Sequence, residues 1–147
     1  MIAHQVSVFL ENKPGRLKKI TAVLKEQKVN IRAMTLSTST AGWGILNLLV
    51  DRPEKACEIL TATGHPAVLR EIVVVKMGDA PGTLHDMLLL LAKAGLNVQN
   101  AYGTVLGDQR SAILVIDVED VEDVESVQQI FREAGVETLS TEQVYRI

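Results

Sequence analysis

Two short segments of the sequence, ENKPGRL at residues 11–17 and GDAPGTL at residues 78–84, share a Pro-Gly pair and lead into an apolar periodic run. A loop that runs into a helix N-terminus presents unpaired N–H groups and a partial positive charge, which suit a carboxylate. Gly15 and Gly82 carry no Cβ, so the loop backbone can approach a ligand closely, and the preceding proline lowers the loop's conformational freedom. These residue types favour the binding of a small molecule.

The two turns differ chemically two residues before the proline, where the first has Asn12 and the second has Asp79. Lys13 and Arg16 give the first turn a neutral-to-positive character. A carboxylate at Asp79 would repel a ligand carboxylate at the same helix end, but it could accept a hydrogen bond from an ammonium group. We therefore expect two non-equivalent sites, with a simple helix cap as the alternative role for Asp79.

Asn30 and Asn97 follow the two periodic runs at the same distance from their turns. An asparagine side chain can both donate and accept hydrogen bonds, which matches a ligand that carries both charges. The alternative is that these residues only tolerate the unusual backbone where a helix stops.

Other residues that could carry chemistry are isolated from one another. His4, His65 and His85 lack metal-binding spacing, and the acidic run at residues 117–125 lacks a calcium-loop pattern. That run is expected to lead into the last helix, with a weak cation site as the alternative. Cys57 is the single cysteine and has apolar neighbours, which predicts a buried thiol. The sequence thus predicts no metal site, no cofactor and no catalytic residue, and the protein is not expected to be an enzyme.

Two aromatic residues occupy places where a ligand or a partner could meet them. Trp43 lies between two glycines in a predicted turn, and packing on a neighbouring subunit or strand is the favoured interpretation, with ligand contact as the alternative. Tyr102 could contact a ligand between the repeats or pack across a strand.

The elements that must position these residues occur twice. Pro14-Gly15 matches Pro81-Gly82 at a constant offset that also relates Leu24 to Leu91 and Asn30 to Asn97. Each copy reads as strand, helix, two strands joined by a tight turn, helix and short strand. Predicted strands cover residues 5–10, 31–39, 44–50, 67–70, 71–77, 98–106, 111–118 and 137–145, and the closing helices cover residues 52–63 and 123–134.

The helix after each turn is expected to be amphipathic. The first buries Leu17, Ile20, Val23 and Leu24. The second buries Leu84, Met87, Leu88 and Leu91, with Leu89 and Leu90 outside this stripe.

This order predicts an α+β fold of two ferredoxin-like βαββαβ repeats, residues 1–70 and 71–147, with antiparallel sheets side by side and helices on one face. The composition is globular, with 47% hydrophobic and 22% charged residues. A net charge of -3 and 3% aromatic residues argue against nucleic acid as a partner. Neither a membrane span nor a secretory signal is recognisable, so a cytoplasmic protein is expected, without a membrane partner.

Two copies of a strand, a loop ending in Pro-Gly and a leucine, an amphipathic helix and an Asn followed by Ile or Val resemble a tandem ACT-domain protein. Residues 11–15 with Asn30 are similar to the regulatory domain of phosphoglycerate dehydrogenase, where the two asparagines hold an effector serine across a domain interface. The resemblance implies ligand-binding residues in both copies, and the first turn is favoured because it keeps the Asn pair. The implied set is Asn12, Lys13, Pro14, Gly15, Arg16, Leu17, Asn30, Ile31, Asp79, Ala80, Pro81, Gly82, Asn97, Val98 and Tyr102.

The resemblance also implies function. It indicates a non-catalytic regulatory protein that binds a small free amino acid at the interface of its two ACT repeats and modulates amino-acid metabolism. The expected partners are the amino-acid effector, a second copy in a homodimer and an enzyme of that metabolism. The alternative is a structural or interaction scaffold of the same fold that has lost ligand binding.

Overall fold

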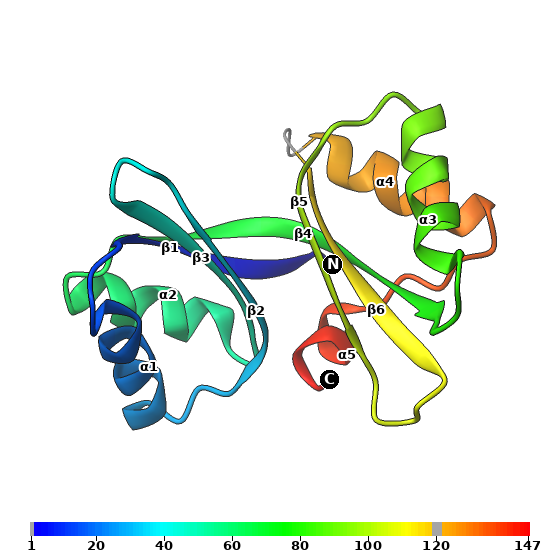
Figure 1. Cartoon of the computed structure of the whole chain (residues 1–147). Helices are drawn as coiled ribbons and strands as arrows, with labels where there is room; N and C mark the ends of the chain where they lie inside the picture. Colours follow the sequence, from blue (N-terminus) through cyan, green and yellow to red (C-terminus); the bar gives the residue numbers. More distant parts are fainter. Residues whose placement is uncertain (1, 119–121) are drawn as a thin grey trace. The chain divides into compact units, whose positions relative to one another are not determined.

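The computed structural model describes residues 2–118 and 122–147 (Figure 1). The elements, in chain order, are β1 (Ala3–Glu11), α1 (Arg16–Glu26), β2 (Ile31–Thr38), β3 (Trp43–Val50), α2 (Pro53–Ala62), β4 (Ala67–Gly78), α3 (Thr83–Lys93), β5 (Val98–Val105), β6 (Ser111–Val118), α4 (Glu122–Glu133) and α5 (Thr141–Tyr145). The described strands are ordered β2-β3-β1-β4-β6-β5. The α+β class and the order of strand, helix, two strands and helix in each copy are as the sequence predicts.

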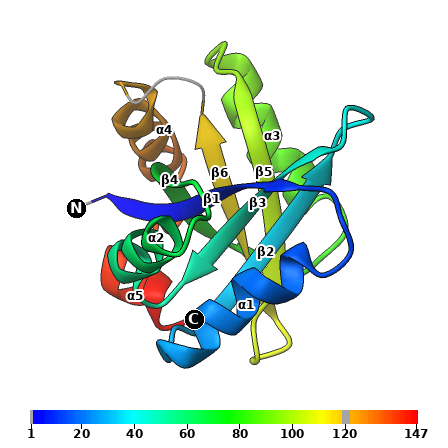
Figure 2. The same cartoon turned by 90° about the vertical axis from the view of Figure 1, so that its left-hand side faces the viewer.

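The chain forms two compact units, one consisting chiefly of His4–Arg70 and the other of Glu71–Tyr145. In the first unit β3 pairs antiparallel with both β1 and β2, and α1 and α2 cover one face of these strands (Figure 2). Alternate β1 residues such as Val6 and Val8 point to that face. They pack with Ile20 and Leu24 of α1 and Leu60 of α2. The predicted apolar stripe of α1 therefore forms the first core.

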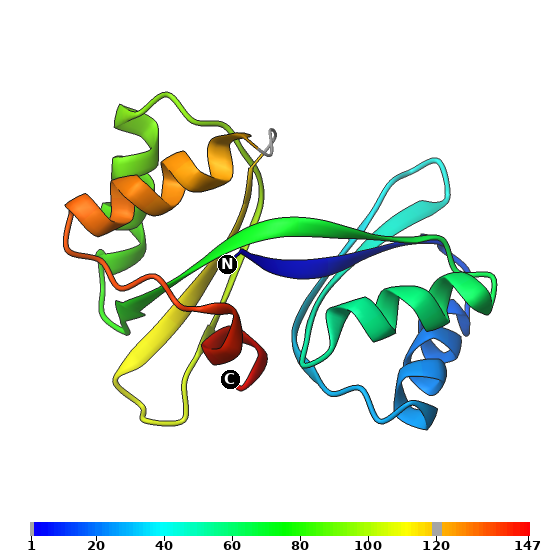
Figure 3. The ribbon, with the colours of Figure 1, turned by 180° about the vertical axis from the view of Figure 1, so that it is seen from behind.

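The second unit repeats this plan with β6 paired antiparallel to β4 and β5. Its core joins Val73 and Val75 of β4 to Leu91 of α3 and to Val127 and Phe131 of α4, the two helices seen side by side in Figure 3. Phe131 is fully buried.

Strand β4 corrects two predicted elements. The sequence suggested one strand ending the first copy at residue 70 and another beginning the second copy at residue 71. The structure has one continuous strand, Ala67–Gly78, which gives its first residues to one unit and the remainder to the other. No turn residue lies between the two β-branched runs, so the backbone stays extended.

The predicted final strand at residues 137–145 is also wrong over most of its length. Residues Glu137 and Leu139 exchange backbone hydrogen bonds with β4, at Lys76 and Val74, and Thr138 bridges Val75. The chain then turns into helix α5, whose start Ser140 marks: its hydroxyl accepts from the Gln143 N–H while the Gln143 side chain accepts from the Ser140 N–H. This reciprocal capping box favours a helix over a strand.

Helix α3 buries only part of the predicted stripe. Leu91 is buried and Met87 and Leu90 pack against the core, whereas Leu84 and Leu88 remain 47% and 40% exposed. Leu89 is also exposed. The apolar residues of α3 are therefore too many for the single face that its own unit covers.

Within the described residues, no helix is both long and apolar enough to cross a membrane, and no group of three or more potential metal ligands is present. The acidic run extends over residues 119–121, which lie outside the described residues. Cys57 is half-buried, packs against the first core and donates its S–H to the Ala67 carbonyl, with the sulfur and oxygen 3.4 Å apart.

Candidate functional site

The two Pro-Gly turns have nearly the same backbone. Gly15 and Gly82 are the N-cap residues of α1 and α3, with φ of 85° and 87°. A positive φ of this size is left-handed backbone, which glycine adopts without steric cost. Glycine offers no side chain to cap the helix, but the first amide of each helix is already paired within the turn. The Arg16 N–H donates to the Lys13 carbonyl over 3.2 Å, and the Thr83 N–H donates to the Ala80 carbonyl over 3.3 Å.

Each turn is held to the tight turn between the next two strands. The Asn12 N–H donates to the Gly42 carbonyl over 2.8 Å, and the Asp79 N–H donates to the Arg110 carbonyl over 2.9 Å. Both residues act here through the backbone. The matching bonds explain why the turn keeps one shape in both repeats despite its different side chains.

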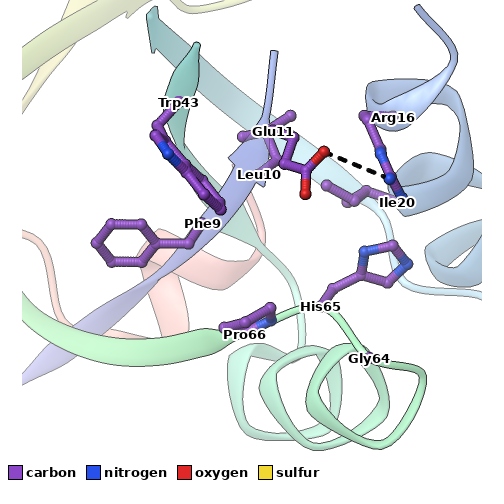
Figure 4. Close-up of a pocket in the computed structure, with 9 residues that line it drawn as sticks. All are labelled: Phe9, Leu10, Glu11, Arg16, Ile20, Trp43, Gly64, His65 and Pro66. Carbon is purple, nitrogen blue, oxygen red and sulfur yellow. Dashed lines mark ion pairs between the residues drawn. The ribbon is translucent and has the colours of Figure 1, made fainter. Parts of the chain in front are cut away.

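A cavity of about 240 Å³ opens beside the first turn (Figure 4). It lies where the end of β1, the first two turns of α1, the start of β3 and the loop between α2 and β4 meet. Its lining residues are Phe9, Leu10, Glu11, Arg16, Ile20, Trp43, Gly64, His65 and Pro66. All belong to the first unit.

Opposite charges line one part of this cavity. A Glu11 carboxylate oxygen lies 2.9 Å from the Lys13 ammonium and 3.6 Å from the Arg16 guanidinium. The hydrogen bond from Lys13, then its charge, lowers the pKa of the Glu11 carboxyl, and the Arg16 charge acts in the same direction. Figure 4 shows Glu11 and Arg16 facing each other, with His65 beside Arg16. The site thus places a carboxylate and a guanidinium within reach of one small ligand.

Two aromatic rings line the other part. Phe9 and Trp43 are 51% and 54% exposed and lie together on the far side of Glu11 in Figure 4. The β1–β3 register pairs Glu11 with Trp43, which fixes the indole next to the carboxylate. Large exposed aromatic residues beside charged groups are typical of a binding surface.

The second unit has a cavity at the equivalent place, of about 400 Å³. Its lining residues are Lys76, Met77, Gly78, Thr83, Met87, Ser111, Gly135, Val136 and Glu137. Three structural features show the equivalence. Arg16 and Thr83 each begin a helix. The Glu11–Trp43 strand pair corresponds to the Gly78–Ser111 pair.

The third feature is a backbone hydrogen bond that occurs at the same place in both units. The Phe9 N–H donates to the Pro66 carbonyl, and the Lys76 N–H donates to the Glu137 carbonyl, each over 2.9 Å. The nine lining positions therefore correspond one to one between the cavities, although the side chains differ.

The residues predicted from the sequence do not form one site within a unit. Arg16 lines the first cavity, and Lys13 reaches Glu11. Asn12, Pro14 and Gly15 shape the turn, and Leu17 packs against the core. Asn30 and Ile31 line a separate hollow of about 430 Å³ beyond the other end of α1.

The length of α1 sets the separation of Asn12 and Asn30. Its 11 residues span about 16 Å at 1.5 Å per residue. One amino acid cannot contact both asparagines of the same unit. The paired Asn site implied by the resemblance would have to combine Asn12 with an asparagine from another ACT unit.

Asn30 has a structural role at the end of α1. Its N–H donates to the Asp51 carboxylate over 3.0 Å, and the Asp51 N–H donates back to the Asn30 carbonyl over 3.1 Å. The Arg52 guanidinium donates to the carbonyls of Gln27 and Lys28, which closes the helix end. These bonds fix the connection between α1 and β2.

In the second unit, Asp79, Ala80, Pro81 and Gly82 form the turn before α3, and Gly82 is the N-cap. The helix-cap interpretation of Asp79 is therefore wrong.

Asn97 immediately precedes β5, which begins at Val98. The positive φ after α3 belongs to Gly95 and the one after α1 to Lys28, at 69° and 56°. The proposal that Asn30 and Asn97 tolerate the left-handed backbone is wrong as well.

Tyr102 lies in β5 opposite Val115 of β6 and is 9% exposed. Burial, with the charge of Asp117, raises the pKa of the Tyr102 hydroxyl. Its phenol is therefore neutral at physiological pH.

Sequence reasoning missed Phe9, Glu11, His65 and Pro66 as cavity residues and favoured packing for Trp43. Glu11 could have been predicted from the sequence, because it is the first residue of the ENKPGRL segment. His65 and Pro66 join the cavity only through the Phe9–Pro66 backbone bond, which no local pattern indicates.

The fold, the duplicated turn and the paired cavities define a pair of ACT domains. The family model for an ACT domain pair matches residues 1–141, and the chain belongs to this family. No catalytic domain is identified in the chain. Among curated protein sequences, none matches significantly.

Solved structures show the same fold. A protein from Bacteroides thetaiotaomicron is 28% identical, with a TM-score of 0.89 over 100% of this chain and 98% of that one. The regulatory subunit of aspartate kinase from Thermus thermophilus is 18% identical, with a TM-score of 0.67 over 90% and 93% of the two chains. The corresponding subunit from Thermus flavus is 17% identical, with a TM-score of 0.61 over 92% and 94%.

Proposed function

We propose that this ACT domain pair is a cytoplasmic regulatory protein that binds a free amino acid in the cavity of its first repeat. Occupancy changes how the protein associates with itself or with an enzyme of amino-acid metabolism. The observation that carries the proposal is the Glu11–Arg16 pair, with its charged atoms 3.6 Å apart, at the mouth of a small cavity beside a helix N-terminus.

The charges suit a zwitterion. A free α-amino acid needs donors for its carboxylate and acceptors for its ammonium group, and Arg16 and Glu11 supply them. Both side chains are partly exposed, 39% and 37%, so their mutual ion pair contributes little and a ligand can replace it at small cost. A volume of about 240 Å³ lies below the usual range for drug-sized ligands, which favours a single small molecule.

The solved relatives support a regulatory role by their fold. The Thermus structures are regulatory subunits of aspartate kinase, an assignment that belongs to those proteins. By analogy of fold, we propose that the present chain acts on an enzyme rather than as one. Completion of the site by another ACT repeat stays a prediction of the resemblance.

The first experiment is a thermal unfolding assay of the full chain against a panel of common amino acids. At a ligand concentration of 100 Kd the stabilisation is about 2.7 kcal/mol, which raises the melting temperature by about 5–11 °C. Arg16→Ala should abolish the selective shift. Thr83→Ala, at the counterpart position, should preserve it. A flat panel at millimolar concentrations would contradict amino-acid binding.

A scaffold function is the second candidate, and exposed leucines favour it. Leu84, Leu88 and Leu89 leave an apolar strip on α3, which we propose as a contact between copies in a homodimer. Sedimentation equilibrium of the unsubstituted chain should then show a dimer, and Leu88→Lys should weaken its association. A monomer at micromolar concentration would refute this assembly without bearing on the amino-acid cavity.

A further inference from the structure

The two equivalent cavities differ at the three lining positions, out of nine, that matter most for binding a zwitterion. Glu11 corresponds to Gly78, and Arg16 corresponds to Thr83. The second cavity therefore lacks the carboxylate and the guanidinium of the first. The backbone of the turn is the same in both, because each turn retains its glycine N-cap.

The third difference concerns the aromatic wall. Trp43 corresponds to Ser111, whose hydroxyl donates to the Asp108 carboxylate. The second cavity has the larger volume, about 400 Å³ against 240 Å³. The charged pair and the indole therefore occur together in one cavity and are absent together from its described counterpart.

We propose that the first cavity takes one free α-amino acid with a large apolar side chain and that its counterpart takes none, an inference that rests on the proposed function. Arg16 binds the carboxylate in the two-point geometry that a guanidinium allows. Glu11 accepts from the ammonium group. The ligand side chain then lies against Trp43, which the strand register fixes beside Glu11.

The lining decides the class of side chain. Pro66 is exposed beside the two rings, whereas Leu10 and Ile20 of the lining are buried, so Phe9, Trp43 and Pro66 supply the accessible apolar surface. A polar or charged ligand side chain placed there would lose its water and gain no partner for its charge, whereas an apolar one gains contact area. Phenylalanine and leucine are thus preferred to serine and lysine.

The charged residues of the second cavity do not replace the missing pair. Lys76 takes the place of Phe9 rather than that of Arg16. There its charge helps to lower the pKa of Asp108. Glu137 takes the place of Pro66, on the loop rather than at the helix start. No guanidinium stands at the first residue of α3.

Calorimetric titration of the full chain with phenylalanine, leucine, serine and lysine tests the inference. We expect one molecule bound per chain and at least tenfold tighter binding of phenylalanine or leucine than of serine. Arg16→Thr, which copies the second repeat, should weaken all of them at least tenfold. Trp43→Ser should reduce the preference for apolar ligands to less than threefold while serine binding stays within twofold.

Matched controls lie in the second repeat. Thr83→Ala and Ser111→Ala should leave every affinity within twofold, and far-ultraviolet circular dichroism should show all variants folded. Arg16→Lys provides a milder change should Arg16→Thr fail to fold, and intermediate weakening is expected. Tightest binding of serine or lysine, or two molecules per chain, would overturn this inference and leave amino-acid binding intact. An absence of binding for all four would overturn this inference, and a flat panel of all the common amino acids would overturn amino-acid binding as well.

Discussion

Replacement of Gly15 by alanine isolates the backbone requirement of the turn that borders the cavity. Gly15 has φ of 85°, and a Cβ built there meets no described atom within 4 Å. The substitution therefore introduces no clash, and its cost is the left-handed conformation of an L-residue alone. That cost is about 1–2 kcal/mol.

The same reasoning gives two matched variants. Gly82 has φ of 87° and equally open space, so Gly82→Ala should cost the same as Gly15→Ala within about 0.5 kcal/mol. Gly78 is the last residue of β4, just before the second turn, and its φ is not positive. A Cβ built there also meets no described atom within 4 Å. Gly78→Ala should be neutral or stabilise the fold by up to about 1 kcal/mol, because it restricts the unfolded chain.

Urea unfolding of the ligand-free variants, followed by circular dichroism, measures these differences. A loss of 1–2 kcal/mol corresponds to a melting temperature lower by about 2–8 °C for a chain of this length. If Gly15→Ala proved neutral, or if Gly78→Ala were as destabilising as Gly82→Ala, the positive φ would not be what fixes glycine in the turn.

Three further predictions concern the second unit. Gly103→Ala would place a Cβ 2.8 Å from the Ile113 carbonyl oxygen, so it should lower the free energy of unfolding by about 1–3 kcal/mol in urea titrations, and neutrality would refute the close strand approach. Because burial raises the pKa of Tyr102, its contribution to stability is complete below the ordinary value near 10 and declines as pH rises above it; Tyr102→Phe should flatten that decline in melting curves between pH 9 and 11. Hydrogen bonds, the largest from the Ser111 hydroxyl, lower the pKa of Asp108 to about 2, so the stabilisation is present above pH 4 and disappears as pH falls toward 2. Asp108→Asn should therefore lower the melting temperature at pH 7 more than at pH 2.5, and an equal effect at both would contradict the role of the charge.

The sequence predicts elements best where local chemistry and packing agree. The α1 stripe is right because Ile20 and Leu24 recur at helical spacing on a helix with a single apolar face. On α3 the same rule holds only for Met87 and Leu91, because five leucines offer several stripes and only packing within the unit decides that Leu90 joins them in place of Leu84 and Leu88. The prediction for the final segment fails for a different reason: the capping pair Ser140–Gln143 starts a helix where a strand was predicted.

The cavity is less predictable than the fold. Its charged half lies within one short segment, since Glu11 and Arg16 flank the Pro-Gly pair, so sequence reasoning could reach it. Its other half comes from the start of β3 and from the loop before β4. His65 lines the cavity because α2 has ended before Gly64 and because the next residue, Pro66, accepts a backbone hydrogen bond from β1. This long-range contact cannot be recognised from the local sequence. Residues distant in sequence converge only after the sheet forms.

The repeated turn and the ligand chemistry have separate physical causes. The glycine N-cap and the backbone hydrogen bond to the neighbouring hairpin occur in both repeats with the same geometry. Folding alone is therefore sufficient reason for the turn to occur twice. A ligand requirement should instead appear where the repeats differ. Glu11, Arg16 and Trp43 differ from Gly78, Thr83 and Ser111 at equivalent positions of the same cavity. The Pro-Gly motif therefore identifies the fold, and the proposed ligand specificity is assigned to the unmatched side chains around it.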